Sequence, residues 1–200
     1  ATNGTGADAL AISATGISGE ATIKNGTADD AYSGFGTGLE WYGQLNCAMA
    51  VRLKTDDIAA TKIEVGFTDA TDDGGACNDL DGATFTATDC AVWAFDTDDS
   101  TDNWKLASTP DGGTTDTVTD TSIAPVADTY ETLIVALEDT AAHFYRLDSN
   151  GYQTYRASHT TGPSKDVALT PWVFTQTREG SDEKTVTVDF IRVWQRRTVS

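Results

Sequence analysis

The segment from residue 69 to residue 81 concentrates side chains that could bind a hard cation. Calcium takes about six to eight oxygen ligands, which aspartate supplies well, so this segment is a candidate calcium site. Its spacing is not that of an EF-hand, because no glutamate stands at the twelfth position after Asp69 or Asp72. A solvated acidic turn is the alternative, and no other cofactor is expected. The candidate ligands are Asp69, Asp72, Asp73, Asp79 and Asp81.

The cysteines and histidines offer less chemistry. Cys77 and Cys90 bracket an aspartate-rich loop, and a disulfide between them would stabilise the fold by about 3 kcal/mol in a chain-entropy model. Two free thiols are the alternative. Cys47 falls on the apolar side of an expected strand and reads as a small buried hydrophobe. His143 and His159 have no cysteine or aspartate at zinc-ligand spacing, so we expect ordinary polar positions for both.

The net charge of the chain limits the classes of partner that we expect it to bind. The formal net charge is −18, with 31 acidic and 13 basic residues. Nucleic acid and anionic membranes would be repelled, because binding to them needs clustered lysine and arginine, and the one such cluster is Arg196 and Arg197. No apolar run is long enough to span a bilayer. The first residues lack the features of a signal peptide, and Ala1 fits either loss of an initiator methionine or a trimmed start.

The elements that must position any site are predicted to be strands. No window shows apolar residues at helical spacing, whereas alternating segments separated by glycine and aspartate turns recur along the chain. We expect a long strand from Leu39 to Lys54, a central strand from Thr129 to Glu138, and a hairpin that turns at Asn150 and Gly151. The fold class is therefore all-β, a two-sheet antiparallel jelly-roll sandwich.

The last predicted strand, Thr185 to Gln195, changes its pattern midway. Val186 and Val188 share one face, but Ile191 and Val193 lie on the other parity, which indicates either a bulge near Asp189 or burial of both faces. Tryptophans could also form a sugar-stacking platform. Trp104 and Trp172, at strand ends, are the two best placed to stack on a ligand, although packing in the core or at its rim is favoured over stacking for both. We expect the following to pack within strands: Trp41, Trp93 and Trp194.

The chain divides into two parts by composition. Residues 1–38 are rich in glycine, alanine, threonine and serine, and form either an N-terminal arm or an edge strand near Glu20 to Lys24. Residues 39–200 form the jelly-roll β-sandwich domain. The closing strand belongs to the core, which argues for one domain.

Several segments resemble, in order, the concanavalin A-like lectin and glucanase jelly-roll superfamily, which includes laminin-G-like domains. They are IEVGFTDA, VWAFDTD, NWKLAS, YETLIVAL, AHFYRLDSNGYQTY, ALTPWVF and VTVDFIRVW, and together they cover about residues 39–196. The resemblance implies this fold. Laminarinase-type hydrolases of the superfamily carry Glu-x-Asp-x-Glu on one strand, because a retaining mechanism needs two carboxyls about 5 Å apart. The seven glutamates here are scattered, so no catalytic residue and no enzyme are expected.

Two functions remain on this basis. A jelly roll of this kind with a glycine-rich arm resembles the decoration, cement or head-fibre proteins of tailed bacteriophages. We expect a non-enzymatic virion structural protein on the outer capsid surface, in contact with the major capsid protein or another virion protein, and compatible with a homo-oligomer. The alternative is an extracellular carbohydrate-binding module or lectin-like adhesion domain. Fold alone does not choose between them.

Overall fold

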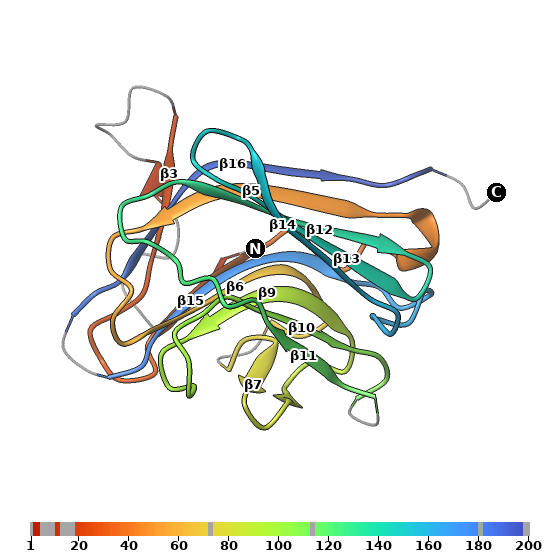
Figure 1. Cartoon of the computed structure of the whole chain (residues 1–200), viewed down its shortest axis with the longest axis horizontal. Coiled ribbons are helices and arrows are strands. Elements are labelled where there is room, and N and C mark those ends of the chain that lie inside the picture. The colour runs from red at the N-terminus through yellow and green to blue at the C-terminus, as the bar shows by residue number, and fades with distance from the viewer. Residues whose placement is uncertain are drawn as a thin grey trace.

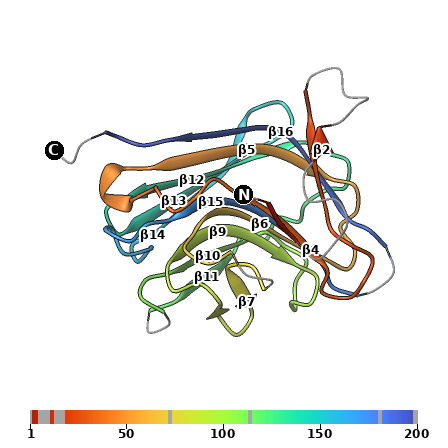
Figure 2. The ribbon, with the colours of Figure 1, turned by 180° about the vertical axis from the view of Figure 1, so that it is seen from behind.

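The computed structural model describes residues 2–4, 11–12, 19–71, 74–112, 115–179 and 182–197. These residues form two seven-stranded antiparallel sheets that pack face to face, plus a small two-stranded sheet (Figures 1 and 2). The predicted all-β, two-sheet antiparallel sandwich is confirmed. The one helix among the described residues, η1 (Gly43–Leu45), is a single 3₁₀ turn, so no described helix could span a membrane.

The chain crosses several times between the two large sheets, so each sheet contains strands from distant parts of the sequence. Sheet A has the order β1 (Thr2–Gly4), β4 (Tyr32–Gly36), β15 (Thr170–Thr177), β6 (Thr61–Thr68), β9 (Cys90–Asp96), β10 (Lys105–Thr109) and β11 (Thr117–Asp120). Sheet B has the order β14 (Gln153–His159), β13 (Ala141–Leu147), β12 (Glu131–Glu138), β5 (Ala48–Thr55), β16 (Thr185–Trp194), β3 (Ala21–Lys24) and β2 (Ala11–Ile12). The small sheet pairs β7 (Cys77–Asp79) with β8 (Thr84–Phe85).

The long strand predicted from Leu39 to Lys54 is only half present. Its second half is β5, but the first half makes a single bridge at Trp41 and then the turn η1. The turn ends at Asn46, whose φ of 49° lies in the left-handed region that asparagine tolerates better than most residues. Alternation alone did not reveal this break, because the sequence keeps the same alternation on both sides of Asn46.

The first 38 residues contribute to both sheets. Ala21–Lys24 pairs with β16 on one side and with β2 on the other, so it lies inside sheet B rather than at its edge. Tyr32–Gly36 pairs with β15 in sheet A. Residues 5–10 and 13–18, which belong to the predicted arm, lie outside the described residues.

Other predicted elements are confirmed. The hairpin of β13 and β14 turns at Gly151, which has a φ of 84°. In β16 the register against β5 shifts between Val188 and Phe190, so the bulge predicted near Asp189 is present. After the bulge, Ile191 and Val193 pack against the core.

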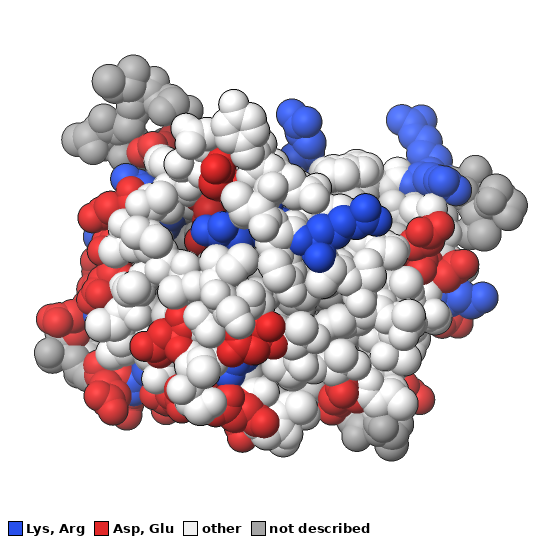
Figure 3. Space-filling model, in the orientation of Figure 1, with Lys and Arg blue, Asp and Glu red and all other residues white. Residues whose placement is uncertain are grey.

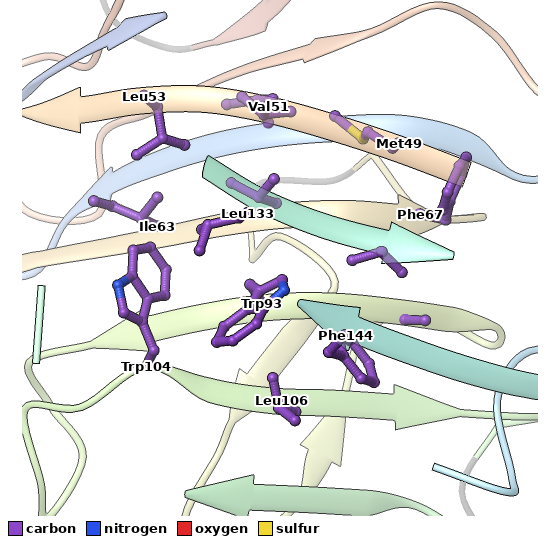
Figure 4. Packing of buried hydrophobic residues seen from close by; sticks show 14 of the residues in the cluster. Met49, Val51, Leu53, Ile63, Phe67, Trp93, Trp104, Leu106, Leu133 and Phe144 are labelled. Carbon is purple, nitrogen blue, oxygen red and sulfur yellow. The ribbon is translucent and has the colours of Figure 1, made fainter. Parts of the chain in front are cut away.

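The core fills the space between the sheets with large apolar side chains (Figure 4). Trp93 is fully buried near its centre and contacts Trp104 and Phe144 edge to face, with ring centroids 6.3 and 6.2 Å apart. Its indole N–H donates to the carbonyl oxygen of Ile134 at 3.1 Å, which ties sheet A to sheet B. Such edge-to-face pairs add to the free energy gained from burial alone.

Candidate functional site

The outer face of sheet A is covered by the chain's own residues. Strands β6, β9, β10 and β15 are buried at every position, on the outward side as well as the inward side. The segment 74–89, which carries β7 and β8, lies across this face, with β7 on the side of sheet A away from sheet B in Figure 1. The covering contact is an apolar cluster of Ala76, Cys77, Leu80, Ala87, Cys90, Val92, Ala94 and Ala107.

A buried charged pair on β6 anchors this cover. The Glu64 carboxylate accepts the backbone N–H groups of Ala76 and Cys77 at 2.6 and 2.9 Å. The ammonium of Lys62 lies 3.3 Å from Glu64 and donates to the carbonyl oxygen of Gly74 at 2.7 Å. Both side chains are at most 1% exposed. Among the described residues, sheet A therefore offers no open face to a long ligand.

Two candidate calcium ligands are committed to loop structure. Asp69 Oδ1 accepts the N–H groups of Thr88 and Asp89, both at 3.1 Å. Asp79 Oδ1 accepts the N–H of Gly82 at 2.8 Å. Asp69 thus ties the start of the acidic segment to residues 88 and 89, and Asp79 stabilises the turn at its end.

The third described candidate is in an ion pair. Asp81 lies 2.6 Å from the Lys105 ammonium, whose hydrogen bond lowers the pKa of Asp81 to about 2. Asp72 and Asp73 lie outside the described residues. Within the described part of the chain, no three histidine, cysteine, aspartate or glutamate side chains gather as a metal site. Calcium binding by this loop stays a prediction.

The three cysteines are free thiols, and all are buried. Burial raises the pKa of Cys47 to about 12 and raises those of Cys77 and Cys90 as well. Cys77 and Cys90 are hydrogen-bonded to each other through their side chains beneath segment 74–89. Protonated, buried thiols of this kind are poor nucleophiles.

The two tryptophans considered for stacking on a ligand are packed instead, which was the favoured expectation for both. Trp104 and Trp172 are 0% and 1% exposed, since each indole points into an apolar layer and donates its N–H to a glutamate. Trp194, which we expected to pack, is instead 46% exposed on β16. The change of parity at the bulge was the sequence signal for the exposure of Trp194. Because Ile191 and Val193 face the core after the bulge, Trp194 faces outward.

The outer face of sheet B is open. Its outward positions form rows that cross five strands, β16, β5, β12, β13 and β14. One row pairs Arg192, Ala50, Ile134, Tyr145 and Arg156 in sequence across the sheet. The next row pairs Trp194, Ala48, Ala136, His143 and Ser158. We call these two rows, with Phe190 and Arg52 of the following row, the sheet B face.

Positive charge gathers on the sheet B face of this acidic protein. Figure 3 shows lysine and arginine over the upper part of the molecule, where Figure 1 places β16 and β5, while acidic side chains crowd the left and lower parts. Arg192 and Arg156 are exposed, and neither forms an ion pair with a carboxylate of the described residues. Arg52 is paired with Asp189 at 2.7 Å and stacks over the Tyr130 ring at 4.2 Å.

The imidazole of His143 lies on this face between a hydroxyl group and a carboxylate. His143 Nδ1 lies 2.7 Å from the hydroxyl oxygen of Ser158, and Nε2 lies 3.6 Å from the carboxylate of Glu138. Its side chain is 25% exposed, so a bound molecule could reach it. An imidazole held this way can act as a general base or acid.

Comparison with known proteins identifies the fold. No protein-family model matches the sequence, and no curated protein is significantly similar to it. A β-1,3-glucanase from Mycobacterium marinum superposes with a TM-score of 0.58 at 11% identity, covering 88% of this chain and 74% of the glucanase. The polysaccharide lyase family 7 alginate lyase A1-II′ gives 0.55 at 14%, covering 92% and 83%. A protein of unknown function from Shewanella oneidensis MR-1 gives 0.59 at 13%, covering 94% and 77%.

These neighbours correct two expectations. The expectation of a non-enzymatic protein is wrong, because solved structures with this fold include a glucanase and an alginate lyase. The missing carboxylate pair argues against one retaining mechanism only, and elimination by a lyase does not use that pair. The virion role gains no support from these structures. At these identities the likeness shows the fold alone, a two-sheet jelly-roll sandwich.

Proposed function

We propose that this is a carbohydrate-active protein that binds a polysaccharide along the sheet B face. One observation carries the proposal. Trp194 and Phe190 are 46% and 40% exposed on the sheet face that the protein leaves open, on the same side of β16 with Arg192 between them. Exposed aromatic side chains are costly in water, and where they gather on a surface they usually mark a binding site. Their flat apolar rings suit the C–H faces of sugar rings.

Two further facts support this reading. The rows of the sheet B face span five strands, so the surface is broad enough for several consecutive sugars rather than a single one. The structures that share the fold include proteins titled as a β-1,3-glucanase and an alginate lyase, both of which act on polysaccharides. The outer face of sheet A is less suitable, because segment 74–89 occupies it.

Replacing Trp194 with alanine tests the proposal. The affinity for a polysaccharide is expected to fall about tenfold, because the half of the indole surface that is still exposed would no longer be buried by the ligand. Binding is measured by affinity electrophoresis and calorimetry against a panel of neutral and acidic polysaccharides. Cleavage is tested in parallel by following the chain length of each polysaccharide, because His143, which can act as a general acid or base, lies on the same face.

The matched control is Val126→Ala. Val126 is also an exposed apolar residue, at 58%, but it lies in the loop between β11 and β12. Its substitution is expected to leave binding unchanged. The proposal fails if no polysaccharide in the panel binds, or if Trp194→Ala and Val126→Ala bind as tightly as the unaltered protein.

A further inference from the structure

We infer that the ligand of the sheet B face is an acidic polysaccharide, a chain of sugars that carries carboxylate or sulfate groups. This inference rests on the proposed function and names the class of ligand. Its basis is the distribution of charge. The protein as a whole carries a formal net charge of −18, yet the sheet B face carries three arginines and no carboxylate. An anionic chain would be repelled by most of the surface and attracted here.

The charges at outward positions of β5, β12, β13, β14 and β16 show this excess. The cations are Arg52, Lys54, Arg156 and Arg192. The carboxylates are Asp189, already paired with Arg52, and Glu138, which is 69% exposed and faces His143. Arg196 and Arg197 follow β16 directly and are exposed. No ion pair within the described residues neutralises Arg156, Arg192, Arg196 or Arg197.

Two of these arginines fit a ligand that lies across the strands. Arg192 and Arg156 occupy opposite ends of one row, separated by four strand spacings, or about 19 Å. Between them the row presents uncharged side chains, Ala50, Ile134 and Tyr145. A sugar chain bound along the row would place acidic groups at its two ends and pyranose rings over the middle. Arginine suits this role because its guanidinium donates two parallel hydrogen bonds to a carboxylate or sulfate.

The aromatic residues favour sugar over other polyanions. Arg156 lies over the Tyr145 ring at 5.6 Å, and Trp194 flanks Arg192 on the same strand face. Duplex DNA carries one charge per about 1.7 Å, so about 11 phosphates would cross a 19 Å row that holds two arginines. The surplus phosphates would then approach the acidic remainder of the surface. An acidic polysaccharide has at most a few charges per sugar and leaves apolar ring faces free for the aromatic side chains.

The test compares single and double arginine variants. Arg192→Gln and Arg156→Gln are each expected to weaken binding to alginate about three- to tenfold. The two residues are far apart, so the double variant is expected to show the product of the two effects. Raising the salt concentration from 0.05 to about 0.5 M is expected to weaken alginate binding by the unaltered protein and to have little effect on the double variant. Lys165→Gln is the control, because this substitution removes the same charge at an exposed residue in the loop before β15.

The outcomes separate this inference from the proposed function. Tighter binding of alginate than of a neutral β-1,3-glucan of matched length, lost in the arginine variants and kept in Lys165→Gln, supports it. Equal or tighter binding of the neutral glucan, unchanged in the arginine variants but lost in Trp194→Ala, overturns the acidic ligand and keeps the polysaccharide site. Tighter binding of DNA than of alginate overturns it in favour of a nucleic acid. Absence of binding to either glycan overturns both proposals.

Discussion

Replacing Glu64 with alanine is expected to lower the free energy of unfolding by about 3–5 kcal/mol. The carboxylate is fully buried on β6 and accepts the N–H groups of Ala76 and Cys77 and the indole N–H of Trp172. Its loss leaves these donors without an acceptor and leaves the Lys62 ammonium as an uncompensated buried charge. Urea unfolding at neutral pH measures the change.

Two further variants show whether burial is the cause. Glu183→Ala removes an ion pair of similar length, 2.8 Å to Lys24, but the two side chains are 40% and 35% exposed. That substitution is expected to cost less than about 1 kcal/mol. Lys62→Met combined with Glu64→Leu removes both charges and is expected to be less damaging than Glu64→Ala alone. A loss below 1 kcal/mol in Glu64→Ala would show that the pair does not hold the cover on sheet A.

Acid is expected to destabilise this protein partly through His159. Burial lowers the pKa of His159 to about 4, from an ordinary value of 6.5. The unfolded chain therefore binds a proton more tightly than the folded protein, and stability falls as the pH drops from 6.5 to 4. The shift corresponds to about 3 kcal/mol, which is fully present above pH 6.5 and lost near pH 4.

The contacts of His159 explain why this loss reaches both sheets. His159 ends β14 in sheet B, but its ring nitrogens lie 2.7 Å from Ser108 Oγ in β10 and 3.1 Å from Thr119 Oγ1 in β11, both in sheet A. Ser108 donates its proton to the carbonyl oxygen of Thr161, so Nδ1 must donate to Ser108 and Nε2 must accept from Thr119. Protonation of Nε2 removes that acceptor and buries a charge.

The measurement is the difference in unfolding free energy between pH 7 and pH 4. In His159→Gln, this difference is expected to be about 3 kcal/mol smaller than in the unaltered protein. The carboxylates titrate in both proteins, so the comparison isolates the histidine. His143→Gln keeps His159 and is expected to keep the full difference. Equal pH dependence in the unaltered protein and His159→Gln would contradict the assignment.

The local sequence pattern predicted where strands, turns and bulges occur better than it predicted which side chains become buried. The hairpin at Gly151 and the bulge near Asp189 were readable because turn residues and a change of parity are local signals. The break at Asn46 was not, because apolar residues on both sides of it keep the same alternation. The burial of Trp104 and Trp172 depends on segments distant in the sequence.

The candidate site was harder to predict than the fold. Each row of the sheet B face takes one residue from each of five strands, and one of the rows runs from Trp194 in β16 to Ser158 in β14. The sequence of a single strand does not show which strands will be its neighbours in the sheet. The charge excess appears only once these residues are assembled, since in the sequence its arginines are scattered among aspartates. The acidic loop, which is conspicuous in the sequence, instead folds against sheet A.

The bulge in β16 determines which side chains of the last half-strand face the core and which face solvent. Before it, Val186 and Val188 face the core; after it, Ile191 and Val193 do, and Arg192 and Trp194 face outward. One additional residue thus decides which side chains of the final half-strand meet water. Deleting a single residue there would exchange the two sets, burying an arginine and exposing an isoleucine. In this part of the chain the length of the strand is therefore as constrained as its composition, and homologous chains should tolerate substitutions more readily than insertions or deletions.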